Sequence, residues 1–221
     1  MERRPATAAL AAFACLCGLA LTGLVALLLP VAQVGDSATL GGFTALSVTD
    51  LGGIALRVAH LVDPRPYLVA AGLLAAVAVL RRRPRVALLV PVAMIGASAT
   101  SELLKPLVAQ PRFSEWLGSG SHILAASWPS GHATASMMIA LCAVLVAPPA
   151  LRPLAALLGT GLAVGVSYSI LVLGWHFPSD VLGGFLVAGT WTSAAVAILW
   201  GAEARWPARS GREAVRRATG A

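Results

Sequence analysis

The sequence predicts an all-α membrane protein, a polytopic bundle of about six transmembrane helices with both termini in the cytoplasm. Apolar residues make up 58% of the 221 residues and charged residues only 11%, whereas a soluble domain is about half apolar and about a quarter charged. Apolar runs of membrane-spanning length recur along the chain. The basic residues lie mainly at the ends of these runs. We therefore treat residues 1–221 as a single integral membrane domain, with 1–5 and 201–221 as cytoplasmic tails.

Six apolar runs are candidate spans. A transmembrane helix requires roughly 17–25 predominantly apolar residues, and the first run, residues 6–34, contains no charge. It follows a basic start that resembles a signal peptide, but it exceeds the apolar region of about 7–15 residues that signal peptides carry, so we expect it to be retained. The remaining runs are 66–80, 86–104, 133–150, 153–175 and 181–200. Because the second run is short, five spans are the alternative.

The distribution of basic residues predicts the orientation. Six alternating spans place both termini and the loops 81–85 and 151–152 on one side, where 12 of the 16 Lys and Arg residues lie. The positive-inside rule assigns this side to the cytoplasm. These charges do not gather on a soluble face, so the net charge of +7 does not indicate nucleic-acid binding. The basic residues on this side are Arg3, Arg4, Arg81, Arg82, Arg83, Arg85, Arg152, Arg205, Arg209, Arg212, Arg216 and Arg217.

The segment between the first two spans contains an amphipathic pattern. Apolar residues recur at three- and four-residue spacing over 48–62, with Arg57 and His60 on the polar side. This pattern predicts a short helix lying in the membrane interface. We expect Arg57, His60 and Arg65 to be interfacial residues in the first instance.

Most other polar groups converge on the outer ends of the spans. Ionisable residues at membrane depth indicate function by default. Two cations can hold an anion, a Ser-Gly turn at a helix N-terminus can offer backbone N–H donors, and two histidines with a neighbouring carboxylate can attack or move protons. This combination suits a phosphate ester. The residues are Lys105, Arg112, Ser130, Gly131, His132, Ser169, His176 and Asp180.

Several of these residues also have a purely structural interpretation. Lys105 is compatible with a lysine that extends from a span end to the interface, paired with Glu102 one turn away. Ser169 is equally compatible with a hydrogen bond to the backbone of its own helix. His176 and Asp180 alone would fit a His-Phe-Pro turn with a helix cap. Their convergence with His132 from a third span favours catalysis.

Three segments resemble the signatures of one known family. Residues 105–112 (KPLVAQPR), 129–132 (PSGH) and 169–180 (SILVLGWHFPSD) are similar to the motifs Lys-x6-Arg-Pro, Pro-Ser-Gly-His and Ser-Arg-x5-His-x3-Asp. These motifs belong to the type 2 phosphatidic acid phosphatase superfamily, in its membrane-bound lipid phosphatase branch. Their order, intervals and predicted membrane side agree, and the six-span layout extends the resemblance over almost the whole chain.

The resemblance implies a role for each motif residue. His176 is the implied nucleophile, which forms a phosphohistidine, and Asp180 orients it. His132 is the implied proton donor to the leaving group and later activates water. No metal and no cofactor is implied. The implied phosphate-binding residues are Lys105, Arg112, Ser130, Gly131 and Ser169, which stabilise developing charge.

Two positions depart from the family pattern. Phe113 stands where the first motif has proline, and Ile170 stands where the third motif has a phosphate-binding arginine. Removing one transition-state donor typically costs about 10²–10³ in rate. We expect the loss to be tolerated, with Arg57 or Arg65 as candidate replacements on the same side of the membrane.

The implied substrate is a lipid phosphate held at the membrane surface. Phosphatidic acid, phosphatidylglycerol phosphate and polyprenyl phosphates or diphosphates all fit, and membrane lipids are the expected surroundings. Transfer of the phosphoryl group to another lipid, by a lipid phosphotransferase, is one alternative. A non-hydrolytic lipid-phosphate binding protein is the other, and Ile170 is its main support. The sequence assigns no protein partner.

Overall fold

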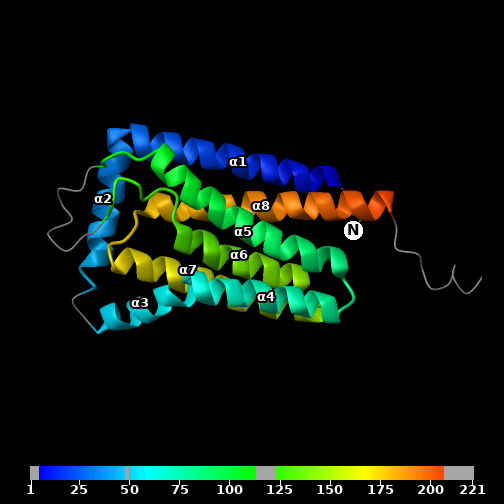
Figure 1. Ribbon diagram of the computed structural model, residues 1–221. Coiled ribbons are helices and arrows are strands. Elements are labelled where there is room, and N and C mark those ends of the chain that lie inside the picture. Colours follow the sequence, from blue (N-terminus) through cyan, green and yellow to red (C-terminus); the bar gives the residue numbers. More distant parts are fainter. Residues whose placement is uncertain (1–4, 48–49, 113–122, 207–221) are drawn as a thin grey trace, which may run out of the picture.

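The computed structural model describes residues 5–47, 50–112 and 123–206, and these contain helices and no strand. The predicted all-α class is confirmed. The elements, drawn in Figure 1, are α1 (Pro5–Leu28), α2 (Pro30–Thr44), α3 (Leu51–Ala59), the short η1 (His60–Val62), α4 (Pro64–Leu80), α5 (Pro84–Leu107), α6 (Gly131–Val146), the short η2 (Pro149–Leu151), α7 (Arg152–Val172) and α8 (Pro178–Arg205).

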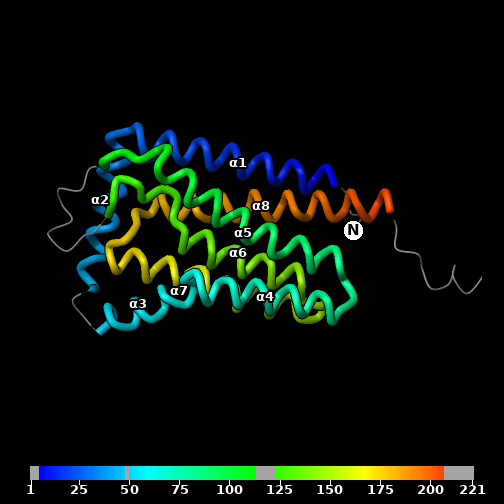
Figure 2. The backbone as a smooth tube through the Cα atoms, viewed as in Figure 1, coloured from blue at the N-terminus to red at the C-terminus, as the bar shows by residue number. Residues whose placement is uncertain are grey.

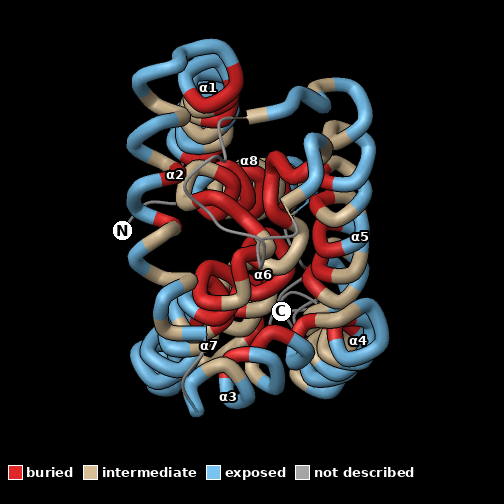
Figure 3. The backbone as a smooth tube through the Cα atoms, turned by 90° about the vertical axis from the view of Figure 1, so that its left-hand side faces the viewer, coloured by how far each residue is buried: buried red, intermediate tan, exposed pale blue. Residues whose placement is uncertain are grey.

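Helix α6 lies at the centre of the bundle and contacts α4, α5, α7 and α8. Helix α1 packs along α8, and α3 packs against α7. Helix α2 crosses one end of the bundle instead of running along it (Figure 2). Viewed from that end, the buried backbone gathers around α6, and the exposed backbone lies on the outer helices (Figure 3).

The outer surface of the bundle is apolar. Phe13, Leu73, Leu88 and Leu157 are each more than 60% exposed. Four helical segments are long and apolar enough to cross a membrane, namely α1, α5, α8 and the continuous segment of η2 and α7 (Pro149–Val172). A fifth forms if α3 with η1 and α4 make one span, bent by 49°. The chain is thus a multi-pass membrane protein, with four or five such spans among the described residues against the six predicted.

The first predicted span, 6–34, divides into two helices. Helix α1 ends at Leu28, and Leu29 has extended backbone angles (φ −99°, ψ 110°). Pro30 explains the break, because proline removes a helical N–H group and forces the preceding residue out of the α region. The chain then turns into α2, which the sequence analysis did not predict. The turn places the polar residues of α2 over the end of the bundle.

Prolines also lie at several other helix boundaries. Helices α4, α5 and α8 begin at Pro64, Pro84 and Pro178, the position where a missing N–H costs least. Helix α6 ends at Val146 before two consecutive prolines, so it has only 16 residues and is shorter than the predicted 133–150. Helix α8 continues to Arg205, beyond the predicted end at residue 200.

The predicted amphipathic helix at 48–62 corresponds to α3 and η1. Its buried residues in α3 are Ala55 and Ala59, whereas Arg57 is exposed. Val48, the first apolar position of the predicted pattern, lies outside the described residues.

The basic loops lie at the end of the bundle opposite α2, together with the start of α1 and the end of α8 (Figure 1). There the Arg81 and Arg83 guanidinium groups donate hydrogen bonds to the Val146 and Leu145 carbonyls. These contacts satisfy carbonyls at the C-terminus of α6, where cations are favoured. The arginines of the two tails, at 3, 4, 209, 212, 216 and 217, lie outside the described residues.

The N-terminus of α6 is held tightly against α8. A Cβ atom on Gly184 would lie 2.6 Å from the Ser130 carbonyl oxygen, so the approach requires glycine. The Thr134 hydroxyl lies 2.9 Å from that same oxygen and 3.2 Å from the Gly184 carbonyl oxygen. It also lies 2.8 Å from the Ser101 hydroxyl of α5. These contacts place the Pro-Ser-Gly-His segment between α5 and α8.

Candidate active site

The three sequence motifs meet at the end of the bundle crossed by α2. Lys105 lies in the last turn of α5, Ser130 is the N-cap residue of α6, and Asp180 lies in the first turn of α8. The Ser130 N–H group donates to the Asp180 carbonyl oxygen at 2.9 Å. This backbone bond joins the second and third motifs directly.

The turn between α7 and α8 presents His176. Gly174 has a φ of 66°, a left-handed conformation that glycine adopts without strain. The Trp175 N–H group closes the turn by donating to the Ile170 carbonyl oxygen at 3.0 Å. The chain then enters α8 at Pro178, which brings His176 over the first turn of that helix.

His176 and Asp180 form the predicted pair. The Asp180 side chain is fully buried, and its Oδ2 atom accepts hydrogen bonds from the Phe177 N–H group at 2.9 Å and from His176 Nδ1 at 3.3 Å. With a proton on Nδ1, the Nε2 atom carries a free lone pair. The arrangement therefore leaves Nε2 of His176 available for attack on an electrophile.

Arg112 lies in a buried cluster behind this pair. Its side chain is 2% exposed, and its guanidinium group donates to Asp180 Oδ1 and to the Ser127 hydroxyl. It also lies 4.0 Å from the centre of the Phe177 ring, a cation–π contact. Arg112 was predicted to bind phosphate, and in this arrangement it holds the carboxylate that orients His176.

Asp36 of α2 completes the cluster. Its carboxylate accepts hydrogen bonds from the Ser179 N–H group at 3.1 Å and from the Ser179 hydroxyl, and it lies 3.4 Å from Arg112. Burial raises the pKa of Asp36 above its ordinary value, although the bonds from Ser179 and the charge of Arg112 act against the shift. The sequence analysis missed this residue. The available signal was a carboxylate directly after an apolar run, which indicates function in a membrane protein.

Lys105 lies beside the N-terminus of α6. Its ammonium group is 2.6 Å from Glu102 Oε1, so the pairing expected for these residues is confirmed. A Cβ atom on Gly131 would lie 3.6 Å from Lys105 Nζ. The cation and the backbone N–H groups at the start of α6 are therefore close enough to contact one anion.

His132 follows Gly131 in the first turn of α6. Its Nε2 atom is 3.7 Å from Asp63 Oδ1, and its ring centre is 6.3 Å from that of His176. The centre of the Trp175 ring lies 5.5 Å from that of the His132 ring. The two histidines of the motifs therefore lie across a short gap from each other.

A cavity of about 440 Å³ opens in front of His132 and Lys105. It lies between α4, α5 and α6, with Glu102, Gly131 and Asp63 also at its polar end. Its other walls are largely apolar and include Leu68 and Ile95, whose side chains are more than half exposed on the outer surface of the bundle. A polar end and an apolar wall that reaches the outer surface suit an amphiphile.

Two other predicted site residues make structural contacts. The Ser169 hydroxyl donates to the Gly165 carbonyl oxygen of its own helix at 2.8 Å, as its structural interpretation expected. The Ser130 hydroxyl caps α6 by accepting from the Ala133 N–H group at 3.3 Å.

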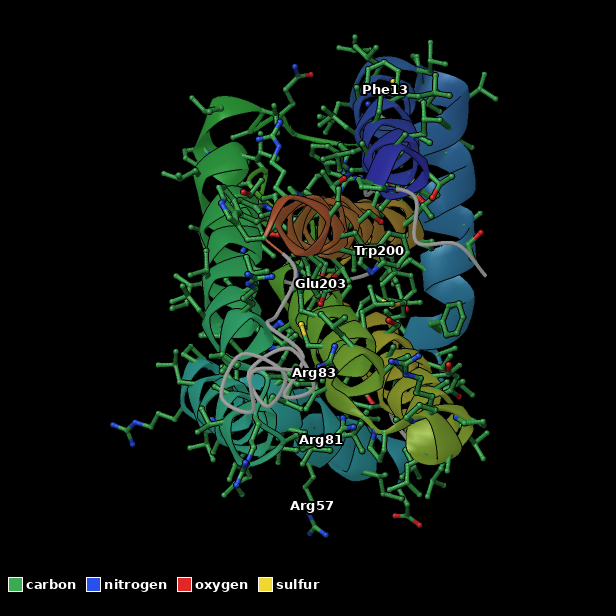
Figure 4. All side chains as sticks on the ribbon, turned by 90° about the vertical axis from the view of Figure 1, so that its right-hand side faces the viewer. Phe13, Arg57, Arg81, Arg83, Trp200 and Glu203 are labelled. Atoms are coloured by element: carbon green, nitrogen blue, oxygen red, sulfur yellow. The ribbon has the colours of Figure 1, made fainter. Side chains whose placement is uncertain are left out.

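Ile170, at the position of the missing arginine, is fully buried in the core. The two candidate replacements, Arg57 and Arg65, are both exposed. Arg57 extends away from the bundle (Figure 4). Phe113, the other departure from the motifs, lies outside the described residues. Among the residues that the structure describes, no group of three or more His, Cys, Asp or Glu side chains is arranged to hold a metal ion.

Comparison with known proteins agrees with this geometry. The family model of the PAP2 superfamily matches residues 86–204, which include all three motifs and more than half of the chain. The chain belongs to the PAP2 superfamily. No curated protein sequence matches it.

A solved structure shares the fold of this PAP2 protein. It is the crystal structure of a transmembrane PAP2-type phosphatidylglycerolphosphate phosphatase from Bacillus subtilis, with a TM-score of 0.67 and 18% sequence identity. The match covers 90% of this chain and 98% of the other. At this identity the likeness establishes the fold, and together with family membership it supports a phosphatase that acts on lipids.

Proposed function

We propose that this PAP2 protein hydrolyses a phosphomonoester or diphosphate of a membrane lipid through a phosphohistidine intermediate. One observation carries the proposal. The ring centre of His176, which is paired with the buried Asp180, lies 6.3 Å from that of His132. His132 lines a cavity whose polar end also holds Lys105 and Gly131 and whose apolar wall reaches the outer surface. A lipid phosphate can thus present its phosphorus to His176 while its tail remains in the bilayer.

The reaction follows from these positions. The lone pair of His176 Nε2 attacks phosphorus, and the bond from phosphorus to the leaving oxygen breaks as His132 gives that oxygen a proton. Water then attacks the phosphohistidine, His132 takes a proton from it, and the P–N bond breaks to release phosphate. Lys105 and the N–H groups at the start of α6 stabilise the charge on the phosphoryl oxygens. The chemistry uses no metal.

Arg112 supports the same reaction from behind the pair. Its bond to Asp180 fixes the carboxylate that keeps the proton on His176 Nδ1. Direct contact of Arg112 with phosphate requires it to exchange a carboxylate partner for the substrate. Ser130 and Gly131 contribute the helix N-terminus, and Ser169 contributes support from the end of α7.

The site faces the extracytoplasmic side in this proposal, because the basic loops lie at the opposite end of the bundle. Single cysteines at Ala109 and Ala150, introduced after replacing the three native cysteines, test the orientation in intact cells. We expect an impermeant thiol reagent to label the cysteine at 109 and not the one at 150. The reverse pattern would move the site to the cytoplasm.

The substrate class includes phosphatidic acid, phosphatidylglycerol phosphate and polyprenyl phosphates or diphosphates. Purified protein in detergent with a chelator should release phosphate from at least one of these, and the His176→Ala variant should release none. Dependence on an added divalent ion would contradict the metal-free chemistry. Transfer of phosphate to an acceptor lipid in place of water would identify a phosphotransferase.

The burial of Ile170 in the core favours one competing function, that of a lipid-phosphate binding protein. It replaces a phosphate-binding arginine by a residue that cannot contact the substrate. Binding of several lipid phosphates without release of phosphate from any of them would support this function and exclude the hydrolase.

A further inference from the structure

The two histidines of the site each face a carboxylate. Asp180 serves His176, and Asp63, which belongs to none of the three motifs, lies 3.7 Å from Nε2 of His132. We propose that Asp63 is the positioning residue of His132. It holds the imidazole in the orientation and protonation state that proton transfer to the leaving group requires. This inference rests on the proposed function.

The position of Asp63 supports this role. It is the N-cap residue of α4, and Pro64 and Pro66 leave only the Arg65 N–H group in the first turn for a capping hydrogen bond. Its side chain makes no such bond. Instead, Oδ2 accepts from His60 Nδ1 at 2.8 Å, and Oδ1 faces His132. The carboxylate is directed away from its own helix and toward two histidines.

The aromatic surroundings limit how the His132 ring can turn. The Trp175 ring centre lies 5.5 Å from that of His132 and 6.1 Å from that of His60. One indole, next to the nucleophile in sequence, therefore packs against both imidazoles. With Asp63 on its Nε2 side, the His132 ring is held from two directions.

The groups around His132 determine whether its imidazole can carry the positive charge of a proton donor. Burial lowers the pKa of His132, and the charges of His176 and Lys105, which face it from the turn before α8 and from α5, lower this pKa further. Glu102 lies on α5 but pairs with Lys105 at 2.6 Å. Asp63 is thus the carboxylate near His132 that favours the imidazolium form, which the proton donor must adopt.

The protons balance without passing through Asp63. The carboxylate holds the proton on Nε2, and the leaving oxygen takes the proton from Nδ1 as its bond to phosphorus breaks. His132 is then neutral, and Nδ1 accepts a proton from the water that attacks the phosphohistidine. Asp63 remains ionised throughout, and His60 keeps its carboxylate in place from the exposed side.

The test compares two substrates with different leaving groups. We expect Asp63→Asn to lower kcat about 10- to 100-fold for dioctanoyl phosphatidic acid, whose leaving alcohol needs a proton. For 4-nitrophenyl phosphate, whose leaving group is stable as an anion, we expect a loss of less than about threefold. Asp50→Asn is the matched control, because Asp50 is an exposed N-cap residue of the neighbouring helix α3. It should change neither rate.

A second measurement separates positioning from general damage. In a His132→Ala background, Asp63→Asn should cause no further loss on phosphatidic acid, because the residue on which it acts is absent. Thermal unfolding in detergent checks the fold, and Asp63→Ser replaces the asparagine variant if that variant does not fold. Equal losses on the two substrates, no loss on either, or a further loss in the His132→Ala background would overturn the inference.

Failure of the proposed function can be distinguished from failure of this inference about Asp63. If the unmodified protein releases phosphate from neither substrate nor from the wider lipid panel, it is not a hydrolase, and the inference is rejected with it. If the unmodified protein is active and the leaving-group dependence is absent, only the role of Asp63 is rejected.

Discussion

The two histidine–carboxylate pairs of the site differ in how they are supported. The side chains of His176 and Asp180 are 11% and 0% exposed, and Arg112 and Asp36 close the space behind them. The side chains of His132 and Asp63 are 27% and 39% exposed and line the cavity. One pair belongs to the core of the protein, and the other belongs to its surface.

This difference predicts two kinds of mutational effect. In the buried pair, removing a partner leaves charged groups without water or a counter-ion, so stability and turnover fall together. In the open pair, water can replace a lost partner, so turnover falls while stability changes little. A nucleophile reacts faster when it is held in a fixed position, and a cavity that admits lipids needs an open side.

The largest effect is expected for His176→Ala. It removes the attacking atom, so turnover should fall at least about 10³-fold on every lipid phosphate. Quenching the reaction of labelled substrate in alkali, which preserves phosphohistidine, should trap no labelled protein. The detergent-solubilised variant should also unfold at a lower temperature than the unmodified protein, because the buried Asp180 carboxylate loses one of its hydrogen-bond partners. Retention of more than a few per cent of activity would show that another residue attacks phosphorus.

Arg112→Ala and Lys105→Ala compare the two halves of the site, the buried half around His176 and Asp180 and the open half around His132 and Asp63. Arg112→Ala leaves Asp36 and Asp180 buried without their cation, which should lower the free energy of unfolding by about 3–5 kcal/mol. Lys105→Ala breaks a pair whose Glu102 is 63% exposed, so the free energy should change by about 0–1 kcal/mol while turnover falls about 10²–10³-fold. Denaturant titration and initial rates measure both quantities. Equal destabilisation by the two variants would remove the distinction between the halves.

Gly184→Ala tests whether the buried half depends on close helix packing. The added Cβ would meet the Ser130 carbonyl oxygen at 2.6 Å, so we expect a loss of about 1–3 kcal/mol in unfolding free energy and a parallel loss of turnover. Gly161→Ala is the control, because a Cβ there meets nothing within 4 Å. The tight contact would be unimportant if both variants behaved alike.

Asp36→Asn should have a smaller effect than Arg112→Ala, since the amide can keep part of the hydrogen bonding, at a cost of about 1–2 kcal/mol. Burial raises the folded-state pKa of Asp36 above its ordinary value of 3.8. The folded state therefore favours the protonated carboxyl group, whose contribution to stability is fully present below that ordinary value and is lost as pH rises through the folded-state pKa. Thermal unfolding across this range should show the unmodified protein losing its advantage over Asp36→Asn as pH rises. An advantage that grows with pH would contradict the sign.

The smallest effect is expected for Arg57→Ala. Arg57 is exposed and directed away from the bundle (Figure 4), so turnover should change less than about twofold, within the range of exposed substitutions. A loss as large as that of Lys105→Ala would mean that Arg57 reaches the phosphate and replaces the arginine absent at position 170.

The local features of this protein were determined by its sequence. Apolar runs predicted a membrane bundle, and three motifs predicted which residues meet at one end of it. The pairs His176–Asp180 and Glu102–Lys105 were also predictable, because residues three or four apart lie on one helical face or turn. Pro30 was a visible signal for the break after α1, since proline cannot continue a helix interior.

Only the tertiary structure decided which distant groups support the site. Asp36 contacts Ser179 across 143 residues of sequence, and Asp63 meets His132 because α4 and α6 pack side by side. Hydrophobic periodicity reports which face of a helix is buried, and it carries no information on the neighbour that covers that face. The partners of Arg112 and His132 therefore follow from how the helices pack, with α2 folded across the end of the bundle.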